Sequence, residues 1–224
     1  MRVVTLGQQK GGVGKTATAI HLACAAASAG KRVALLDMDS VQLTAAKWAR
    51  NRTKDTQLGK IDVREVSVLN IEDVLEELRA QNYDWVFIDM PGKRDGVGKG
   101  LALADFVIMP ARPLAVDIES SYATLQILRR GEKAYAYLMN ICPPQDNASR
   151  ARKVQRVLED GGCEVCPVII IQRIVVPDAI ELGRHAGEMR DGTQSASEYT
   201  ELFKWLDQRI EVKDGKSSRR KAAV

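Results

Sequence analysis

The residues best suited to chemistry lie near the start of the chain, in the string Gln9-Lys-Gly-Gly-Val-Gly-Lys-Thr16. An apolar run, Val3 to Leu6, precedes this string, and an alanine-rich helical run follows it. A glycine-rich loop between a strand and a helix directs backbone N–H groups and the positive end of the helix toward one point. The spacing predicts a phosphate-binding loop, and a glycine-rich turn without a bound nucleotide is the alternative.

Single side chains in this loop have defined chemical uses. Lys15 can reach the β- and γ-phosphates of a nucleotide, and the Thr16 hydroxyl can bind Mg²⁺. The usual pattern starts with a glycine where this chain has Gln9, and an extra lysine, Lys10, follows. We therefore expect a phosphate cradle formed by Gly11, Gly12, Val13, Gly14, Lys15, Thr16 and Ala17.

Carboxylates follow two other apolar runs. Asp37 and Asp39 come after residues 33–36, and Asp89 follows residues 85–88. In open parallel sheets, ligands bind beyond the carboxyl ends of the strands, so these carboxylates should face the phosphate loop. Asp89 is placed like a Walker B carboxylate that holds the metal through water, and an aspartate capping the next turn is the alternative.

Alternating strands and helices must position these groups. The strand-like runs are 3–6, 33–36, 85–88, 106–109, 137–141 and 167–171, and the helical patterns are 16–29, 71–81, 118–131, 148–160 and 195–210. Continuous apolar runs are typical of strands buried on both faces. The alternation predicts an α/β fold with a single doubly wound, mostly parallel sheet and helices on both faces.

Composition indicates an ordinary globular protein. The 224 residues are 45% hydrophobic and 28% charged, with a net charge of +4. We expect one domain over residues 1–211 and a basic, disordered tail over 212–224. No apolar run approaches the ~20 residues of a membrane span, and no signal peptide is visible, so a cytoplasmic location is expected.

The loop resembles the deviant Walker A motif of the ParA/MinD family of dimeric ATPases. The likeness extends over roughly residues 1 to 210 through Asp89-Met90-Pro91, Ala104 to Pro110, Arg112-Pro113, Asp117, Asn140, Gln172-Arg173 to Pro177 and Ala186-Gly187. It implies a P-loop NTPase fold with ATP and Mg²⁺ as cofactors. Asn140 resembles the residue that reads adenine, and Arg173 and Pro177 look like part of the adenine-side loop.

The resemblance also implies roles in catalysis. Lys10 would cross a nucleotide-sandwich homodimer to the partner's phosphates, although a solvated loop lysine is the alternative. Asp39 would orient or activate the attacking water, with Asp37 near the metal. Lys10, Lys15 and Asp39 are thus the predicted catalytic residues, and Thr16, Asp37 and Asp89 are the predicted metal site.

Within the family, the chain resembles the small plasmid-partition type exemplified by ParF, and Trp48 after the switch favours this. Such a protein would form an ATP-dependent homodimer on nonspecific nucleoid DNA, and a ParB-like centromere-binding partner would stimulate hydrolysis. Lys204, Arg209, Arg219, Arg220 and Lys221 are candidate DNA contacts, and a solvated helix face is the alternative. We expect no membrane partner, because the polar C-terminus lacks the amphipathic helix that a MinD-like membrane protein needs.

Two other functions stay open. One is a ParA-like accessory ATPase for conjugative DNA transfer or cargo positioning. The other is an iron–sulfur carrier that uses Cys163 and Cys166, whose spacing suits a metal, although reduced thiols at loops and strand edges are the simpler interpretation.

Three positions depart from the family pattern. Ser40-Val41 replaces a proline after the switch aspartate and adds a residue, which predicts altered loop geometry and hydrolysis. Ala17 replaces a threonine and removes one hydroxyl toward the α-phosphate, a loss of about 0.5 to 1.5 kcal/mol. Lys93, Arg94 and Lys99 add positive charge after Asp89.

Overall fold

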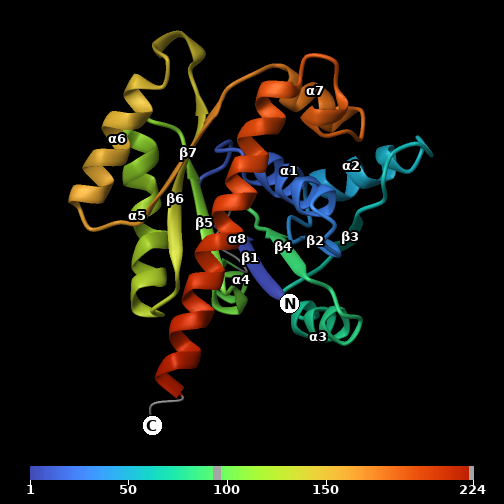
Figure 1. Cartoon of the computed structure of the whole chain (residues 1–224), viewed down its shortest axis with the longest axis horizontal. Coiled ribbons are helices and arrows are strands. Elements are labelled where there is room, and N and C mark those ends of the chain that lie inside the picture. The colour runs from blue at the N-terminus through green and yellow to red at the C-terminus, as the bar shows by residue number, and fades with distance from the viewer. Residues whose placement is uncertain (93–96, 222–224) are drawn as a thin grey trace.

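Seven parallel strands form one sheet in the computed structural model, which describes residues 1–92 and 97–221 (Figure 1). The strand order is β3-β2-β4-β1-β5-β6-β7. The strands are β1 (Arg2–Leu6), β2 (Val33–Asp37), β3 (Asp62–Glu65), β4 (Trp85–Asp89), β5 (Phe106–Ala111), β6 (Tyr135–Cys142) and β7 (Val165–Ile171). The predicted α/β fold with a single doubly wound sheet is confirmed.

Helices cover both faces of the sheet because neighbouring strand residues point to opposite sides. The helices are α1 (Lys15–Ser28), α2 (Thr44–Arg52), α3 (Ile71–Ala80), α4 (Val97–Leu103), α5 (Ala115–Arg130), α6 (Ser149–Asp160), α7 (Val175–Glu181) and α8 (Thr193–Lys221), with short 3-10 turns η1 (Pro144–Asp146) and η2 (Ala186–Glu188). Trp85 and Phe87 of β4 pack in the core under α1 and α8, whereas Val86 and Ile88 pack under α3 and α4.

Four of these elements were not expected from the sequence. They are β3, α2, α4 and α7. β3 is an edge strand of charged and half-buried residues, and α4 contains two glycines, so neither has the apolar pattern that marks a buried element.

The last helix differs from expectation at its end. The backbone of α8 is helical through Lys221, where the sequence predicts a helix end at Ile210 and a disordered tail from 212. Lysine, arginine and glutamate are good helix formers, which is consistent with the extension. The division into residues 1–211 and 212–224 stays a prediction, and residues 222–224 lie outside the described residues.

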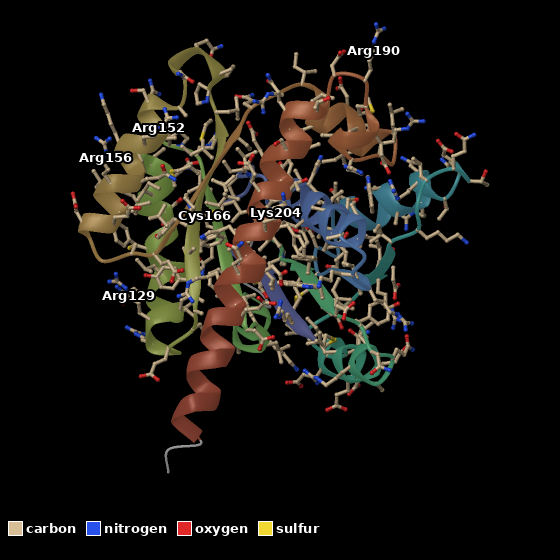
Figure 2. All side chains as sticks on the ribbon, in the orientation of Figure 1. Arg129, Arg152, Arg156, Cys166, Arg190 and Lys204 are labelled. Carbon is tan, nitrogen blue, oxygen red and sulfur yellow. The ribbon has the colours of Figure 1, made fainter. Side chains whose placement is uncertain are left out.

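Charged side chains lie on the outer surfaces of the helices and turns, as Arg152, Arg156 and Arg190 illustrate (Figure 2). Over residues 1–92 and 97–221, no helix combines the length and apolarity needed to cross a membrane.

Candidate functional site

The phosphate loop joins β1 to α1 at the carboxyl edge of the sheet. Gly12 and Gly14 have left-handed backbones, with φ of 72° and 85°. A Cβ on Gly14 would lie 2.4 Å from Asn140 Nδ2, so a side chain has no room there. Gly14 is the N-cap of α1, and no side chain caps its free N–H groups. The start of α1 therefore presents unsatisfied donors, as an anion site requires.

Lys15 lies folded against this loop. Its Nζ donates to the Lys10 carbonyl at 3.0 Å, and the residue is 7% exposed. Burial lowers the pKa of Lys15, while the nearby Asp89 and Asp39 carboxylates raise it. Gly92 lies close above, since a Cβ there would come within 3.7 Å of Lys15 Nζ. The ammonium group is thus held at the loop by backbone and carboxylates together.

Asp37 and Asp89 are partners in the β2–β4 register, and both are buried. Asp37 accepts hydrogen bonds from Asp39 N at 3.0 Å and Ala46 N at 3.1 Å, whereas burial raises its pKa. Burial also raises the pKa of Asp89 to about 7, although a hydrogen bond from Thr16 lowers it. The structure thus brings Thr16, Asp37 and Asp89 to one point.

These residues fit Mg²⁺ bound together with a nucleotide. Asp89 Oδ1 is buried and has no hydrogen-bond partner in the part of the chain that the structure describes. Across residues 1–92 and 97–221, no group of three or more His, Cys, Asp or Glu side chains is placed to hold a metal ion by itself. Mg²⁺ is usually held by one or two carboxylates plus waters and phosphates, so an incomplete protein site is the expected one.

Asp39 shapes the switch loop. Its Oδ1 accepts hydrogen bonds from Val41 N at 3.2 Å and Gln42 N at 3.0 Å, and Leu43 takes a left-handed conformation before α2. This is how the loop accommodates Ser40-Val41. The Asp39 carboxylate lies next to the phosphate loop, where it acts on the charge of Lys15.

Lys10 is ion-paired within its own chain. Its Nζ lies 2.6 Å from Asp117 Oδ1, and Arg112 Nε lies 2.7 Å from Asp117 Oδ2. Burial raises the pKa of Asp117, but the hydrogen bonds from Arg112 and Lys10 outweigh it and lower the pKa overall. Lys10 is therefore paired in the single chain, and its role across a dimer stays a prediction. Sequence reasoning identified Asp117 by resemblance but not as the partner of Lys10.

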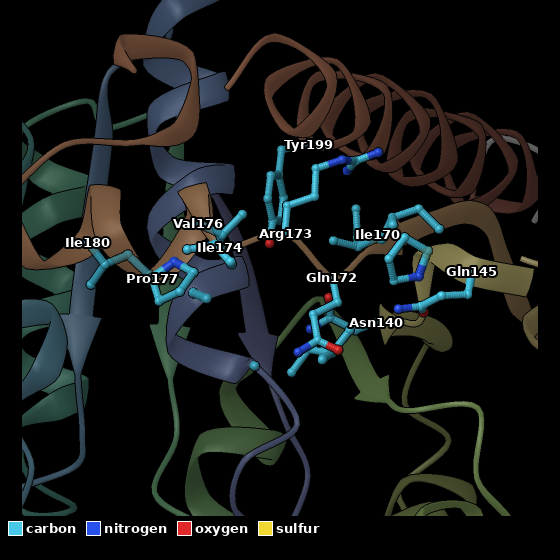
Figure 3. Close-up of a pocket in the computed structure, with 15 residues that line it drawn as sticks. Asn140, Gln145, Ile170, Gln172, Arg173, Ile174, Val176, Pro177, Ile180 and Tyr199 are labelled. Atoms are coloured by element: carbon cyan, nitrogen blue, oxygen red, sulfur yellow. The ribbon is translucent and has the colours of Figure 1, made fainter. Parts of the chain in front are cut away.

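An apolar cavity of about 550 Å³ opens beside the phosphate loop (Figure 3). Its lining comes from the loop and α1, the end of β6, η1, the end of β7, α7 and α8: Gly14, Ala17, Asn140, Ile141, Pro144, Gln145, Ile170, Ile171, Gln172, Arg173, Ile174, Val176, Pro177, Ile180 and Tyr199. The predicted Asn140, Arg173 and Pro177 thus line one cavity with the loop. Tyr199 was missed, because in sequence it is one aromatic on the apolar face of a helix.

Asn140 joins the cavity to the loop. Its Nδ2 donates to Val13 O at 2.8 Å and Thr18 Oγ1 at 3.3 Å, which leaves a buried Oδ1 without a partner among the described residues. A free amide oxygen at an apolar cavity suits the amino group of a base. Arg173 differs, since its guanidinium pairs with Glu198 at 2.8 Å and points toward α8.

The predicted DNA contacts differ in availability. Lys204 is exposed on α8 (Figure 2), whereas Arg209 is paired with Glu164 at 2.5 and 2.8 Å. Lys99 is paired with Glu72 at 2.9 Å. The side chains of Arg219, Arg220 and Lys221, and residues Lys93 and Arg94, lie outside what the structure describes.

The two cysteines with metal-like spacing face opposite sides of the sheet. Cys163 packs against the core under α5 and α6, and Cys166 is buried in the core under α1 and α8, where burial raises its pKa to about 12. One ion or cluster cannot bind both thiols from such positions. The geometry argues against the iron–sulfur interpretation.

Known proteins share this fold and this sequence pattern. The family model of the ATPase MipZ matches residues 2–120, just over half of the chain. Protein ParA of Rhizobium radiobacter is 24% identical over 217 residues, which are 91% of this chain and 94% of that protein. The maintenance of carboxysome distribution protein A of Gloeobacter kilaueensis is 32% identical over 165 residues, or 72% of each chain.

A solved structure has the same fold. The septum site-determining protein MinD of Pyrococcus horikoshii, complexed with Mg-ADP, superimposes with a TM-score of 0.71 at 16% identity and covers 95% of this chain and 98% of its own. The matched family model, the curated relatives and the phosphate loop agree with one another. The chain belongs to the ParA/MinD family of ATPases.

Proposed function

We propose that this protein is a Mg²⁺-dependent ATPase for DNA partition, of the small plasmid type. It binds ATP, forms a homodimer, associates with nonspecific DNA and hydrolyses ATP slowly until a ParB-like partner stimulates it. The observation that carries the nucleotide-binding part of the proposal is Asn140, which joins the phosphate loop to the apolar cavity and keeps one buried oxygen free. The similarity to a curated ParA protein supports the cellular role.

Each residue of the site has one task in this mechanism. The loop N–H groups and Lys15 bind the phosphates, and Asn140 reads the base. Thr16 and Asp89 hold the metal, directly or through water. Bound Mg²⁺ neutralises charge on the transferred phosphoryl group. Asp39 orients the attacking water, because its carboxylate lies beside the loop and is fixed by the switch backbone.

Lys10 connects hydrolysis to dimer formation. In the single chain it is held by Asp117. To reach the phosphates bound by the other subunit, Lys10 must leave the Asp117 carboxylate. A cation added at the transferred phosphoryl group can accelerate its transfer by several orders of magnitude. Dimer formation would then depend on ATP.

A second function is favoured by one comparison. The Gloeobacter kilaueensis relative, at 32% identity, is named for the maintenance of carboxysome distribution and not for DNA partition. The same ATPase cycle could position a cargo other than a plasmid. Both functions use the nucleotide site, and they differ in the partner that stimulates hydrolysis.

The first experiment measures nucleotide and DNA binding together. The parent protein should bind ATP and, only with ATP, a random-sequence duplex, with affinity that falls as salt rises. Lys15→Ala should lose ATP binding and, with it, DNA binding. Tight ATP binding by Lys15→Ala would overturn the site assignment, and ATP binding without DNA binding by the parent would favour cargo positioning.

A further inference from the structure

We propose that helix α6 carries the phosphate-binding surface for duplex DNA, and that the nucleotide cavity is mechanically connected to it. This inference rests on the proposed function, because it assigns a place to the DNA. The α6 surface is defined by four residues, Arg150, Arg152, Lys153 and Arg156. Sequence reasoning placed the DNA elsewhere, on α8 and the C-terminal residues.

All four side chains of the α6 surface are exposed and available. Within the described part of the chain, none of them forms an ion pair with a carboxylate, and Arg152 alone has a hydrogen bond, from Nη1 to Asn147 O at 2.7 Å. Some other basic residues are neutralised, as Lys99 is by Glu72 and Arg209 by Glu164. A phosphate that binds an unpaired side chain displaces only mobile counter-ions. At a paired side chain it would have to displace a carboxylate.

The charges of α6 are arranged against the stability of the helix. Its first turn has no acidic residue and its last turn has no basic one, while Glu159 and Asp160 occupy the end. Helix dipoles favour the reverse order. The basic half of α6 therefore adds to the positive potential of the helix N-terminus. This charge order favours the binding of an anion, whereas helix stability alone would favour the opposite order.

Geometry spreads these cations over the outward half of α6, where Arg152, Lys153 and Arg156 lie within about 100° of one another around the helix axis and Arg150 lies about 60° beyond Lys153. Ala151 and Leu158 are the buried residues of α6, so the helix is fixed on the sheet while the basic side chains face outward. Arg152 and Arg156 are one turn apart, and both point away from the fold (Figure 2). At 1.5 Å per residue, Arg150 and Arg156 are about 9 Å apart along the axis. A patch of this length can face several phosphates of duplex DNA, which has one charge per ~1.7 Å of axis.

The basic surface has a neighbour on α5. Arg129 is exposed, lies on the same side of the molecule as α6, and donates from Nη2 to Gly161 O at 3.4 Å, just past the end of α6 (Figure 2). In contrast, α8 offers Lys204 beside an Arg209 that already has an anion. The α6 side is therefore the better phosphate surface of the two.

The segment before α6 connects this surface to the nucleotide cavity. Pro144 and Gln145 of η1 line the cavity, and Asn147 and Ala148 then lead into α6. Both of these residues, and Ile141 before them, have left-handed backbones with φ between 45° and 60°. Such conformations are unfavourable for residues other than glycine, above all for the β-branched Ile141, and the surrounding contacts must hold them.

Arg152 is attached to that same segment through Asn147 O. A base in the cavity would therefore contact Pro144 and Gln145, in the segment that leads into α6. A shift of this segment would move the Arg152 side chain, which is hydrogen-bonded to Asn147 O. This contact gives nucleotide binding a physical route to the DNA surface, so that DNA affinity can depend on the occupied cavity.

The test compares two double variants of the full chain. Arg152→Gln/Arg156→Gln removes two charges from α6. Lys47→Gln/Arg79→Gln removes two charges from α2 and α3, where both side chains are exposed and form no ion pair within the described residues. Binding to a random-sequence duplex is measured with ATP over a salt series, and ATP hydrolysis without DNA serves as the check of folding.

We expect the slope of log affinity against log salt to become shallower by about 1.8 for the α6 variant, since each lost phosphate contact contributes roughly 0.9. Its affinity at low salt should fall at least tenfold, and its basal hydrolysis should match the parent. The α2/α3 variant should keep the parental slope. Arg150→Gln/Lys153→Gln should reproduce the α6 result and guards against a local folding defect.

The outcomes separate this inference from the proposed function. If the parent binds DNA with ATP and both α6 variants keep its slope, DNA binds elsewhere and the α6 surface is refuted, while the partition ATPase stands. An equal loss in the α2/α3 variant would show a general charge effect and would also refute it. If the parent binds ATP but no DNA at any salt, the proposed function itself fails.

Discussion

At the scale of single residues, the switch carboxylate Asp39 gives the sharpest prediction. Asp39→Ala should slow ATP hydrolysis by about 10² to 10⁴ and let an ATP-bound dimer accumulate, because the positioned group at the attacking water is lost. Phosphate release and sedimentation with ATP would measure this. Asp73→Ala, which changes an exposed carboxylate of α3, is the matched control. Unchanged turnover in Asp39→Ala would show that another group orients the water.

A second prediction at this scale concerns Asp117, which is fully buried and holds two cations. Asp117→Asn keeps the shape but weakens the bonds to Lys10 and Arg112. The free energy of unfolding should fall by about 2 kcal/mol, as for hydrogen bonds to charged groups. Urea denaturation would measure the loss, with Asp62→Asn, a half-exposed partner of Arg64, as a milder control. A loss no larger than in the control would contradict a structural role for this pair.

The residue scale also shows what a sequence can and cannot predict about the site. Lys15, Thr16, Asp37 and Asp89 follow strands or a glycine-rich loop, and local spacing alone placed them together. The ion pairs of Lys10 and Arg173 depend on Asp117 and Glu198, which are distant in sequence. No local pattern encodes such partners, so the intrachain ion pairs of these two residues could not be predicted before the fold was known.

At the scale of elements, helix α1 is joined to the turn η2 by one buried histidine. His21 Nδ1 lies 2.8 Å from the Ala17 carbonyl, and Nε2 lies 3.0 Å from Ala186 N. Since Ala186 N can only donate, Nε2 accepts and the ring is neutral. Burial accordingly lowers the pKa of His21 to about 4. With its lowered pKa, His21 is protonated at a lower pH in the folded protein than in the unfolded chain. Acid should therefore destabilise the contact between α1 and η2.

Neutral His21 contributes fully to the free energy of unfolding above pH 6.5. This contribution is lost as the pH falls toward 4, by about 3 kcal/mol in total. Urea denaturation at pH 7 and at pH 4.5 would measure it. His21→Gln should be less stable at pH 7 but should lose less stability on acidification, whereas His185→Gln, which changes a less buried ring, should keep most of the parental pH dependence. Identical pH curves for His21→Gln and the parent would refute this account.

Element positions followed from the sequence where a strand is buried on both faces, and failed where it is not. β1, β2 and β4 are buried at nearly every position, and each contains the apolar run from which its strand was predicted. β3 at the edge mixes charges with half-buried residues, and α7 is a short cover over the cavity. Burial on one side leaves only a weak pattern in the sequence, which is why β3 at the sheet edge and the short α7 beside the cavity were missed.

At the scale of the whole molecule, one lysine should decide the oligomeric state. Lys10→Ala should keep ATP affinity, because Lys15 and the loop backbone remain. It should weaken ATP-dependent dimerisation, because the cation proposed to reach the partner's phosphates is gone. In the single chain Lys10 is bound to Asp117, so dimer formation must break that pair before it gains the new one.

The measurement is sedimentation with ATP on an Asp39→Ala background, where slow hydrolysis preserves any dimer. Lys60→Ala, which changes an exposed lysine without an ion pair in the described residues, is the control. Because the Asp117 pair competes with the partner's phosphates for the same ammonium group, Asp117→Asn should shift the balance the other way and strengthen the dimer. Equal dimer formation by Lys10→Ala and the control would show that Lys10 acts only within its own chain.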